Sequence, residues 1–226
     1  MSEQGSVSSS VEDYAKAVYV LETPTGGAVS TNTLAERLEI TPGSASGMVR
    51  KLADQGLVEH ERYHGVRLTD AGRTLALSVI RRHPLIEQFL AEALGMPWDR
   101  VHDEAEVLEH VLSGELERLI AAHLGDPDID PHGDPIPTAD FVIAEPQTRS
   151  LAELPIGARG RFVRVSDSDP AKLRYLAEHT IAIGDHLEIV DRQPFGGPLF
   201  VRFGDAEQPI GGELAAVMRV ITEQDG

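Results

Sequence analysis

The feature that most constrains the fold is a pair of short amphipathic helices followed directly by a β-hairpin. Residues 31–38 place their leucines and alanine on one helical face. Thr41 and Pro42 then supply a capping hydroxyl and a proline at the first helical position, which is typical of a helix start. This second helix is predicted to continue to Gln55, because Gly56 is a common helix terminator. Two short helices joined by a brief turn form a helix-turn-helix.

Residues 57–69 follow, and both halves of this segment alternate apolar and polar residues. A His-Gly pair stands at the bend between the halves, so the segment is predicted to form a β-hairpin. Helix, helix, hairpin is the order of a winged helix, in which this hairpin is the wing. A helix over residues 11–22 is expected before the motif. A long helix, capped at Thr69 and Asp70 and ending near Leu94, is expected after it.

The second half of the chain is predicted to be helical at first and β-rich at the end. A helix is expected from about Asp99 to Leu124. Residues 125–137 are too rich in Asp and Pro for a regular element, so they should begin a linker that reaches about Glu153. Short strands separated by Gly and Pro turns then predict a small β-barrel of the SH3-like type. The expected strands are 160–165, 186–191, 199–203 and 217–221, with one helix at 170–177.

The composition restricts the kinds of site that the chain can hold. It has 226 residues and no cysteine, so neither a disulfide framework nor a thiolate metal site is possible. The first ten residues are small and polar, without the apolar stretch of a signal peptide. No apolar run approaches the roughly 18 residues that a membrane span requires. We therefore expect a soluble, cytoplasmic protein with no membrane partner.

The charge is unevenly distributed along the chain. The formal net charge is −17, which alone argues against binding to phosphate groups. Between residues 30 and 83, however, eight basic residues roughly balance the acids. The acidic excess lies between residues 87 and 145, where Arg100 and Arg118 are the only bases. A site for hard cations requires such acids, although most acidic residues simply form a solvated surface.

The segment from residue 102 to residue 110 concentrates groups that can bind metal. At 3.6 residues per turn, four of its side chains fall near one helical face: His102, Glu106, Glu109 and His110. The preceding helix offers His83 and Glu87, an i, i+4 pair. Clustered carboxylates repel one another unless a cation lies between them, and a mixed set of Asp, Glu and His suits a divalent first-row metal.

These residues also have a simpler interpretation. A single histidine on a helix is usually an ordinary core or surface residue, and a glutamate-rich helix is usually a solvated face. Two such clusters on consecutive helices, beside a winged helix, favour a metal site. Enzyme motifs such as the P-loop or the dinucleotide fingerprint are absent from the sequence, so no enzyme is predicted. Four other histidines show no partner pattern and are expected at the surface: His123, His132, His179 and His186.

Three motifs follow the predicted winged helix in a fixed order. They read Arg-Arg-His-x-Leu-x-Glu, Val-His-Asp-Glu-Ala-Glu-x-x-Glu-His and His-Gly-Asp-Pro-Ile-Pro. In this order, and before an SH3-like domain, they resemble the DtxR/MntR family of metal-dependent repressors over nearly the whole chain. The resemblance implies a mainly α fold with a small β part. Its domains would be a winged helix-turn-helix DNA-binding domain at 1–72, a helical metal-binding and dimerisation domain at 73–140, a linker at 141–153 and an SH3-like (FeoA-like) domain at 154–226.

The resemblance implies a primary, activating metal site with one ligand from the first helix and three from the acidic helix. The matching positions are Asp13, Glu106, Glu109 and His110. Iron-sensing members carry Met and Cys at the positions of Asp13 and Glu106. Oxygen ligands in place of sulfur favour Mn(II), so the chain resembles the manganese-sensing branch. Lys16 stands where some manganese sensors have a second acid, which favours two separated sites over a compact two-metal site.

The resemblance also implies an ancillary site, and hence two Mn(II) ions per subunit. Its helical positions are His83, Glu87 and His102. The C-terminal domain supplies at least one further ligand in the family. Arg164 occupies one matching position and cannot bind a cation, which leaves Asp167 as the candidate and Asp169 in reserve. The simpler interpretation of both aspartates is a capped turn before a helix.

By the same resemblance the chain is a homodimer that represses manganese-transport genes by binding a palindromic operator in double-stranded DNA. The family positions that face DNA are Thr41, Gly43, Ser44, Ser46 and Gly47. Because Gly47 replaces the base-reading glutamine of iron-type members, specificity would rest on DNA shape or methyl contacts. Arg50, Lys51 and the wing residue Arg62 are candidate phosphate contacts. The alternatives are an Fe(II)-dependent repressor of the same fold and a carboxylate-bridged di-metal enzyme, which would show turnover.

Overall fold

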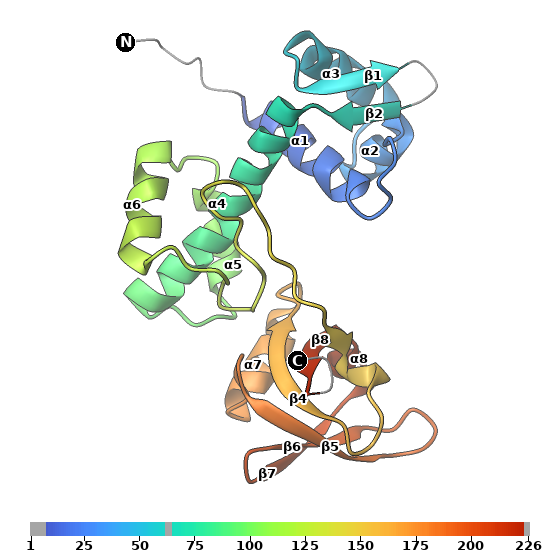
Figure 1. Ribbon diagram of the computed structural model, residues 1–226, viewed down its shortest axis with the longest axis vertical. Helices are drawn as coiled ribbons and strands as arrows, with labels where there is room; N and C mark the ends of the chain where they lie inside the picture. The colour runs from blue at the N-terminus through green and yellow to red at the C-terminus, as the bar shows by residue number, and fades with distance from the viewer. Residues whose placement is uncertain (1–7, 62–64, 224–226) are drawn as a thin grey trace. The chain divides into compact units, whose positions relative to one another are not determined.

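The structure, a computed structural model, describes residues 8–61 and 65–223 (Figure 1). These residues form two compact units. The first unit comprises the described residues up to His83 together with residues 137–142, and the second comprises residues 84–136 and those from 143 onward. Helix α4 (Asp70–Leu94) is continuous, and the division between the units falls inside it.

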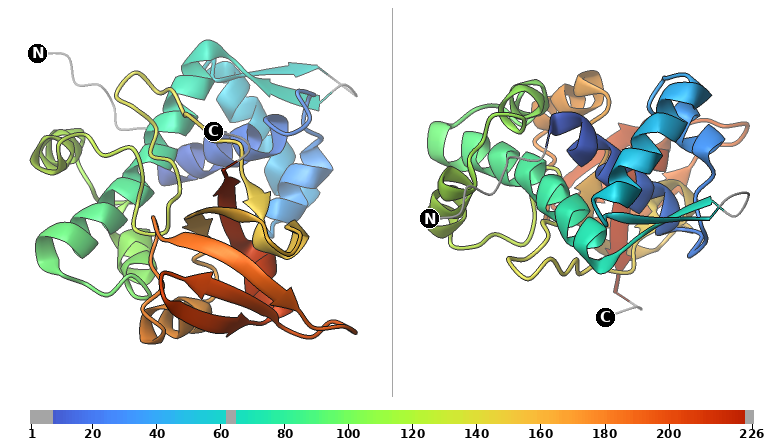
Figure 2. Two further views of the ribbon diagram at one scale, coloured as in Figure 1. Left: turned by 60° about the horizontal axis from the view of Figure 1, so that its bottom comes forward. Right: turned by 90° about the horizontal axis from the view of Figure 1, so that it is seen from above.

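The first unit has the predicted helix, helix, hairpin order of a winged helix. The hydroxyl of Thr41 accepts the backbone N–H of Ser44 and so caps the second helix of the motif, as expected. The two strands pair antiparallel, and both views of Figure 2 show the hairpin beside α3. The bend residue His64 lies outside the described residues. The elements are α1 (Ser9–Glu22), α2 (Thr31–Arg37), α3 (Pro42–Asp54), β1 (Val58–Glu61) and β2 (Gly65–Leu68), followed by the first part of α4.

The single helix predicted between Asp99 and Leu124 is wrong. The structure has two helices there, α5 (Val101–Leu108) and α6 (Gly114–Leu124). Ser113 caps α6, because its hydroxyl accepts the backbone N–H of Leu116, and a Ser-Gly pair favours a helix start over a helix interior. Glu109 and His110 consequently lie in the turn after α5 and not on its face.

A small apolar core holds these helices together. Ile86 and Leu90 of α4 pack against Val101 and Ala105 of α5, and Leu85 packs against α6. Because these residues face inward, the carboxylate of the adjacent Glu87 is buried as well. Within the part of the chain that the structure describes, none of the helices combines the length and the apolar character of a membrane crossing.

Residues 125–136 form an irregular loop, as predicted, with one isolated bridge between Ile129 and Pro135. Asp130 organises its turn, because Oδ1 accepts the backbone N–H groups of His132 at 2.8 Å and Asp134 at 2.9 Å. Gly133 has a φ of +85°, and a Cβ atom at this position would lie 1.9 Å from a backbone carbonyl oxygen. Glycine is therefore what lets the loop lie so close to the neighbouring strand.

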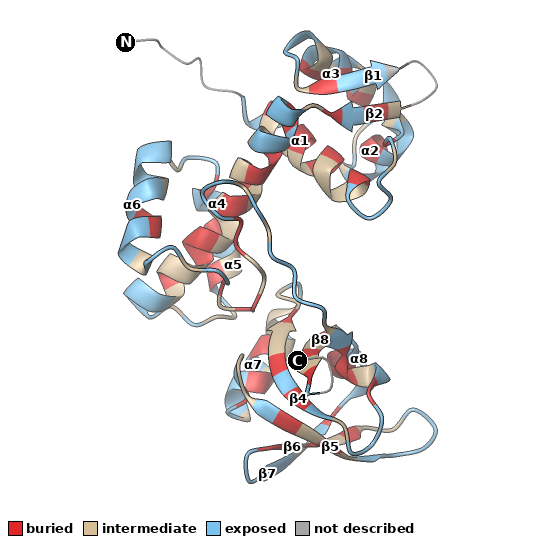
Figure 3. Ribbon diagram, in the orientation of Figure 1, coloured by how far each residue is buried: buried red, intermediate tan, exposed pale blue. Residues whose placement is uncertain are grey.

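The C-terminal part is one antiparallel sheet with the strand order β3-β8-β4-β5-β6-β7. No pairing between β3 and β7 is found in the described ranges, so the predicted closed barrel is not observed there. The sheet surrounds an apolar core that includes Phe162 and Ile189 (buried residues are red in Figure 3). Its strands are β3 (Arg149–Ser150), β4 (Arg159–Val165), β5 (His186–Arg192), β6 (Leu199–Phe203), β7 (Ala206–Ile210) and β8 (Met218–Thr222).

Two short elements precede β4. β3 pairs with β8, and the short helix η1 (Leu151–Glu153) follows it with Leu151 fully buried. The sequence did not predict β7 or the helix α8 (Gly212–Val217). Helix α8 directly precedes β8, which is the strand that was expected at 217–221. The predicted helix before β5 is present as α7 (Pro170–Glu178).

Candidate metal centre

Three side chains of the second unit converge on one point. Nδ1 of His102 lies 3.1 Å from Oε1 of Glu87 and 2.9 Å from Oδ2 of Asp167. A single ring nitrogen carries at most one proton, so it cannot satisfy two carboxylates fully. The ligand atoms of these residues lie within 4.8 Å of one another. His83 lies one turn before Glu87 on helix α4 but in the first unit, so its part in this site stays a prediction.

The donor chemistry of this group fits a divalent cation. All its ligand atoms are carboxylate oxygens or imidazole nitrogens, which suit divalent first-row metals. The side chain of Glu87 is only 1% exposed, whereas those of His102 and Asp167 are 36% and 27% exposed. A carboxylate that is removed from water requires a positive partner. The cluster therefore combines a buried anion with two ligands that solvent can still reach.

The two aspartates before α7 have different roles. Asp169 is the helix cap, because its Oδ1 accepts the backbone N–H of Ala171 at 3.0 Å. Its carboxylate also lies 3.6 Å from Nζ of Lys172. The capped-turn interpretation thus holds for Asp169, whereas Asp167 is the aspartate that joins His102. Arg164, which cannot bind a cation, forms an ion pair of 2.7 Å with Asp134.

The expectation that His132 lies at the surface is wrong. Its side chain is fully buried, and its ring is stacked on Trp98 with the centroids 6.1 Å apart. Nε2 lies 2.7 Å from the carbonyl oxygen of Trp98, and Nδ1 lies 3.5 Å from Oε2 of Glu87. Burial lowers the pKa of His132, but Glu87, the Trp98 carbonyl and Asp130 together raise it to about 9. The sequence signal was its place in the His-Gly-Asp-Pro-Ile-Pro motif.

The acids around His132 are also perturbed. Burial, reinforced by the charges of Asp134 and Glu87, raises the pKa of Asp130 to about 8. Burial likewise raises the pKa of Asp134, although Arg164 opposes the shift. These directions show that negative charge is unfavourable in this region, as is typical where a cation is bound or a function is located.

For the other three histidines that were expected at the surface, the observed exposure is closer to the prediction. His123 and His186 are exposed, as expected. His179 is half-buried, and its Nδ1 lies 2.8 Å from the carbonyl oxygen of Tyr175.

The residues predicted for the primary site belong to both units. Asp13 is half-buried on α1 in the first unit. In the second unit Glu106 lies on α5 with its side chain 52% exposed, and Glu109 is buried at the end of that helix. Nε2 of His110 lies 3.8 Å from Oε1 of Glu109. The structure thus brings Glu109 and His110 together, and their joint site with Asp13 stays a prediction.

Helix α3 presents most of the residues that were predicted to face DNA. Ser46 is half-buried, and the other six are exposed: Thr41, Gly43, Ser44, Gly47, Arg50 and Lys51. The hydroxyls of Thr41 and Ser44 lie 2.9 Å apart, and that of Ser46 donates to the Pro42 carbonyl oxygen at 2.9 Å. These hydroxyls are therefore partly engaged within the helix, and Arg50 and Lys51 carry its positive charge. The predicted phosphate contact Arg62 lies outside the described residues.

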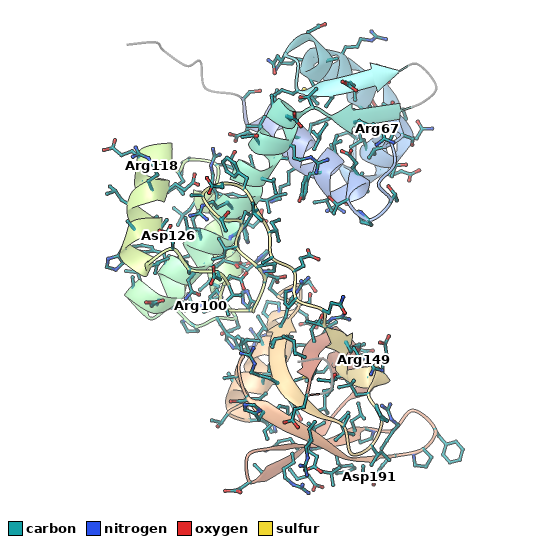
Figure 4. The ribbon with its side chains drawn as sticks, in the orientation of Figure 1. Arg67, Arg100, Arg118, Asp126, Arg149 and Asp191 are labelled. Carbon is teal, nitrogen blue, oxygen red and sulfur yellow. The ribbon has the colours of Figure 1, made fainter. Side chains whose placement is uncertain are left out.

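A buried glutamate that the sequence did not single out holds the wing in place. Glu22, the last residue of α1, accepts the backbone N–H of Leu68 at 3.3 Å through Oε2. Its Oε1 lies 3.5 Å from Arg73 and 3.9 Å from Arg67, which is labelled on the hairpin in Figure 4. Glu22 therefore joins α1 to β2 and to the start of α4. Its sequence context offers no signal, because glutamate is rarely buried.

Comparisons with known proteins agree with these features. The model of the iron dependent repressor N-terminal DNA binding domain matches residues 6–66. The model of the iron dependent repressor metal binding and dimerisation domain matches residues 69–138. The FeoA domain matches residues 149–221. Together these models cover helix α3, the candidate metal ligands of the helical part and the C-terminal sheet.

The similar proteins include one named for iron and one named for manganese. The diphtheria toxin repressor of Corynebacterium diphtheriae is 34% identical over 191 residues, which is 80% of this chain and 84% of that protein. The iron-dependent repressor IdeR of Mycobacterium leprae is 32% identical, over 80% of this chain and 76% of the relative. A solved manganese-dependent transcriptional repressor in complex with manganese is 42% identical with a TM-score of 0.77, and the match covers 94% of this chain and 99% of that one. The chain therefore belongs to the DtxR family of metal-dependent transcriptional repressors, which are DNA-binding regulators and not enzymes.

Proposed function

We propose that this chain is a Mn(II)-dependent repressor of manganese homeostasis genes, which acts in the cytoplasm as a homodimer on a palindromic operator. The observation that carries the choice of metal is the donor set. Glu87, His102 and Asp167 converge through oxygen and nitrogen atoms alone, and the sequence contains no cysteine. Hard oxygen donors favour Mn(II) over softer ions. The 42% identical solved relative that is named for manganese supports the same choice.

Two ions per subunit are part of the proposal. The ancillary ligands would be His83, Glu87, His102 and Asp167, and the primary ligands Asp13, Glu106, Glu109 and His110. When bound, a divalent cation supplies the positive charge that carboxylates in each set need. We keep 1–72, 73–140, 141–153 and 154–226 as the proposed functional divisions, and an SH3-like arrangement for the last.

The first unit indicates how metal binding at Asp13 would affect DNA binding. Asp13 and Glu22 both lie on α1. Glu22 contacts the backbone of β2 and the side chain of Arg73 on α4. Fixing α1 through Asp13 therefore also restricts the wing that this helix contacts. Because binding free energies are coupled reciprocally, operator DNA must tighten metal binding by the same factor.

An exposed apolar surface on the helices of the second unit supports the homodimer. Its members are Leu94 (63% exposed), Val107 (68%), Val111 (77%), Leu116 (48%) and Leu119 (60%). Figure 3 shows α6 as mostly exposed. Large apolar side chains left in solvent are unfavourable, so five of them between residues 94 and 119 favour burial against a partner. These residues lie within the stretch that matches the dimerisation domain, so we propose a second copy of the chain as the partner.

Operator binding under different metals tests the proposed function. Fluorescence anisotropy of a labelled operator would be followed in chelator, in Mn(II) and in Fe(II) under anaerobic conditions. We expect tight binding in Mn(II) and weak binding in chelator. Tight binding in Fe(II) with no response to Mn(II) would show instead an iron-dependent repressor. Equal binding in all three conditions would contradict metal dependence altogether.

A further inference from the structure

We propose that a cavity beside the C-terminal sheet binds a phosphate group, either free or as part of a small phosphomonoester, through Arg164 and Arg219. The cavity has a volume of about 440 Å³, which lies in the range of small-molecule sites in proteins. Three segments of the second unit line it: the loop of residues 125–136, the segment that leads to β3, and the strands β4 and β8. The described lining residues include none of the proposed metal ligands, so the inference goes beyond the proposed function.

An irregularity in β4 turns Arg164 toward the cavity. Successive side chains of a regular strand point to opposite faces of the sheet, so Arg164 would lie on the same face as the buried Phe162. The register instead shifts between these two residues, and Arg164 pairs directly with Arg219 on β8. The side chain of Arg164 is accordingly 43% exposed, whereas Phe162 is fully buried. A β-bulge often redirects a side chain beside a functional site in this way.

The bulge thus places two positive charges directly opposite each other, an arrangement that is destabilising in a sheet. Nε of Arg164 lies 2.7 Å from Oδ1 of Asp134. Arg219 donates from Nε to the hydroxyl of Thr148 at 3.0 Å and from Nη2 to its carbonyl oxygen at 2.8 Å. Within the described ranges, the two terminal nitrogens of Arg164 and Nη1 of Arg219 make no hydrogen bond. An anion between the two guanidinium groups would remove their repulsion and accept from these donors.

The donors favour a phosphate over a carboxylate. Guanidinium groups bind both anions, but two of them on neighbouring strands offer donors to more than the two oxygens of a carboxylate. The hydroxyl of Thr148 accepts from Arg219, so its own proton is available for a further oxygen. Glu145 also lines the cavity, but two arginines against one glutamate leave the lining positive in a chain of net charge −17. The volume leaves room for the organic part of a phosphomonoester.

Calorimetric titration of the metal-free full chain tests the proposal, and its result does not depend on the proposed metal response. The three probes are inorganic phosphate, glycerol 3-phosphate and dimethyl phosphate. At about pH 8 the first two carry close to two negative charges, whereas dimethyl phosphate carries one, like the backbone of a nucleic acid. We expect one phosphate or glycerol 3-phosphate per subunit and much weaker binding of dimethyl phosphate. Tighter binding of glycerol 3-phosphate than of inorganic phosphate would identify a phosphomonoester as the ligand, and equal binding would identify free phosphate.

Four variants place the bound phosphate. Arg164→Gln and Arg219→Gln should each weaken phosphate binding by roughly 10 to 100-fold, because each removes charge-assisted hydrogen bonds. Arg161→Gln is the matched control, since it removes the same charge from the same strand at an exposed position outside the cavity lining. Glu145→Gln should tighten phosphate binding, because a negative charge leaves the lining. Glu145 is exposed, so this variant should fold normally.

Several results would overturn the proposal. The first is the absence of saturable binding of both inorganic phosphate and glycerol 3-phosphate. The second is an equal loss of affinity in Arg161→Gln, which would indicate a general effect of charge. The third is equally tight binding of dimethyl phosphate, which would indicate a nucleic-acid backbone as the partner. Unchanged affinity in Arg164→Gln and Arg219→Gln would place the phosphate elsewhere on the chain.

A second measurement uses the unmodified protein and does not depend on how the variants fold. Phenylglyoxal modifies arginine side chains, and mass spectrometry of the digested protein gives the rate at each position. Phosphate should protect Arg164 and Arg219, while Arg161 should react at the same rate with and without it. Equal rates with and without phosphate at Arg164 and Arg219, or equal protection of all three arginines, would overturn the assignment.

Discussion

Replacing Gly133 with alanine should separate the loop of residues 125–136 from β4. Gly133 has a φ of +85°, and the added Cβ would lie 1.9 Å from the carbonyl oxygen and 2.8 Å from the carbonyl carbon of Val163. Both atoms belong to the backbone, so no side chain can move aside. Either the loop or β4 must shift, and the hydrogen bond from Val165 to His132 is the first contact at risk.

The expected loss of stability follows from three contributions. A left-handed conformation costs an alanine roughly 1–2 kcal/mol, and a part of this is offset because alanine also restricts the unfolded chain by about 0.4–1 kcal/mol. Overpacking against backbone costs roughly 1–3 kcal/mol. Loss of one hydrogen bond adds about 1 kcal/mol. We therefore expect the free energy of unfolding to fall by about 3 kcal/mol.

Gly125→Ala provides a matched control. Gly125 ends α6 with a φ of +74°, but nothing lies within 4 Å of the position its Cβ would take. This variant carries the conformational cost alone, about 1 kcal/mol. Urea unfolding of both metal-free variants, followed by circular dichroism, measures the difference. Equal losses in the two variants would refute the close contact between the loop and β4.

Three further changes test other parts of the structure. Asp13→Ala should lower Mn(II)-dependent operator affinity by 5 to 150-fold in a gel shift. The control is Glu12→Gln, which breaks the neighbouring 3.0 Å ion pair with Arg82 and should keep metal dependence. Identical behaviour of the two variants would remove Asp13 from the site. Glu22→Gln should lower the free energy of unfolding, measured by calorimetry, by roughly 1–3 kcal/mol, because charge-assisted contacts with Arg73 are lost. It should also weaken operator binding measured by anisotropy, and an unchanged operator affinity would argue against control of the wing by Glu22. Val111→Glu should shift sedimentation toward the monomer. Because Val111 is 77% exposed, the same change should alter the free energy of unfolding by less than about 0.5 kcal/mol. An intact dimer would place the interface elsewhere.

Features determined by neighbouring residues could be predicted from the sequence. Thr41 and Pro42 define the start of α3 through a local hydrogen bond and a fixed φ, and the alternation in residues 57–69 defines the hairpin. The break at Ser113 was also encoded locally, but the continuing acidic pattern concealed it. The sequence therefore placed Glu109 and His110 on a helix face when they lie in a turn.

Features determined by distant residues were harder to predict. The burial of His132 depends on Trp98 and Glu87, which are remote in the sequence and offer no periodic signal. The choice between Asp167 and Asp169 also required the structure, because both have the same local context. Only their separate contacts, with His102 and with the start of α7, distinguish the two aspartates. The pairing of the short strand β3 with β8 likewise joins opposite ends of the C-terminal part.

The central claim is that metal binding and operator binding are coupled, and Mn(II) affinity measured with and without operator DNA tests it most directly. Calorimetric titration of Mn(II) into the full chain would be performed alone and with saturating operator. The account predicts that operator DNA tightens Mn(II) binding by the same factor by which Mn(II) tightens operator binding, between about 5 and 150-fold. A Mn(II) affinity that does not change when the operator is bound would contradict it.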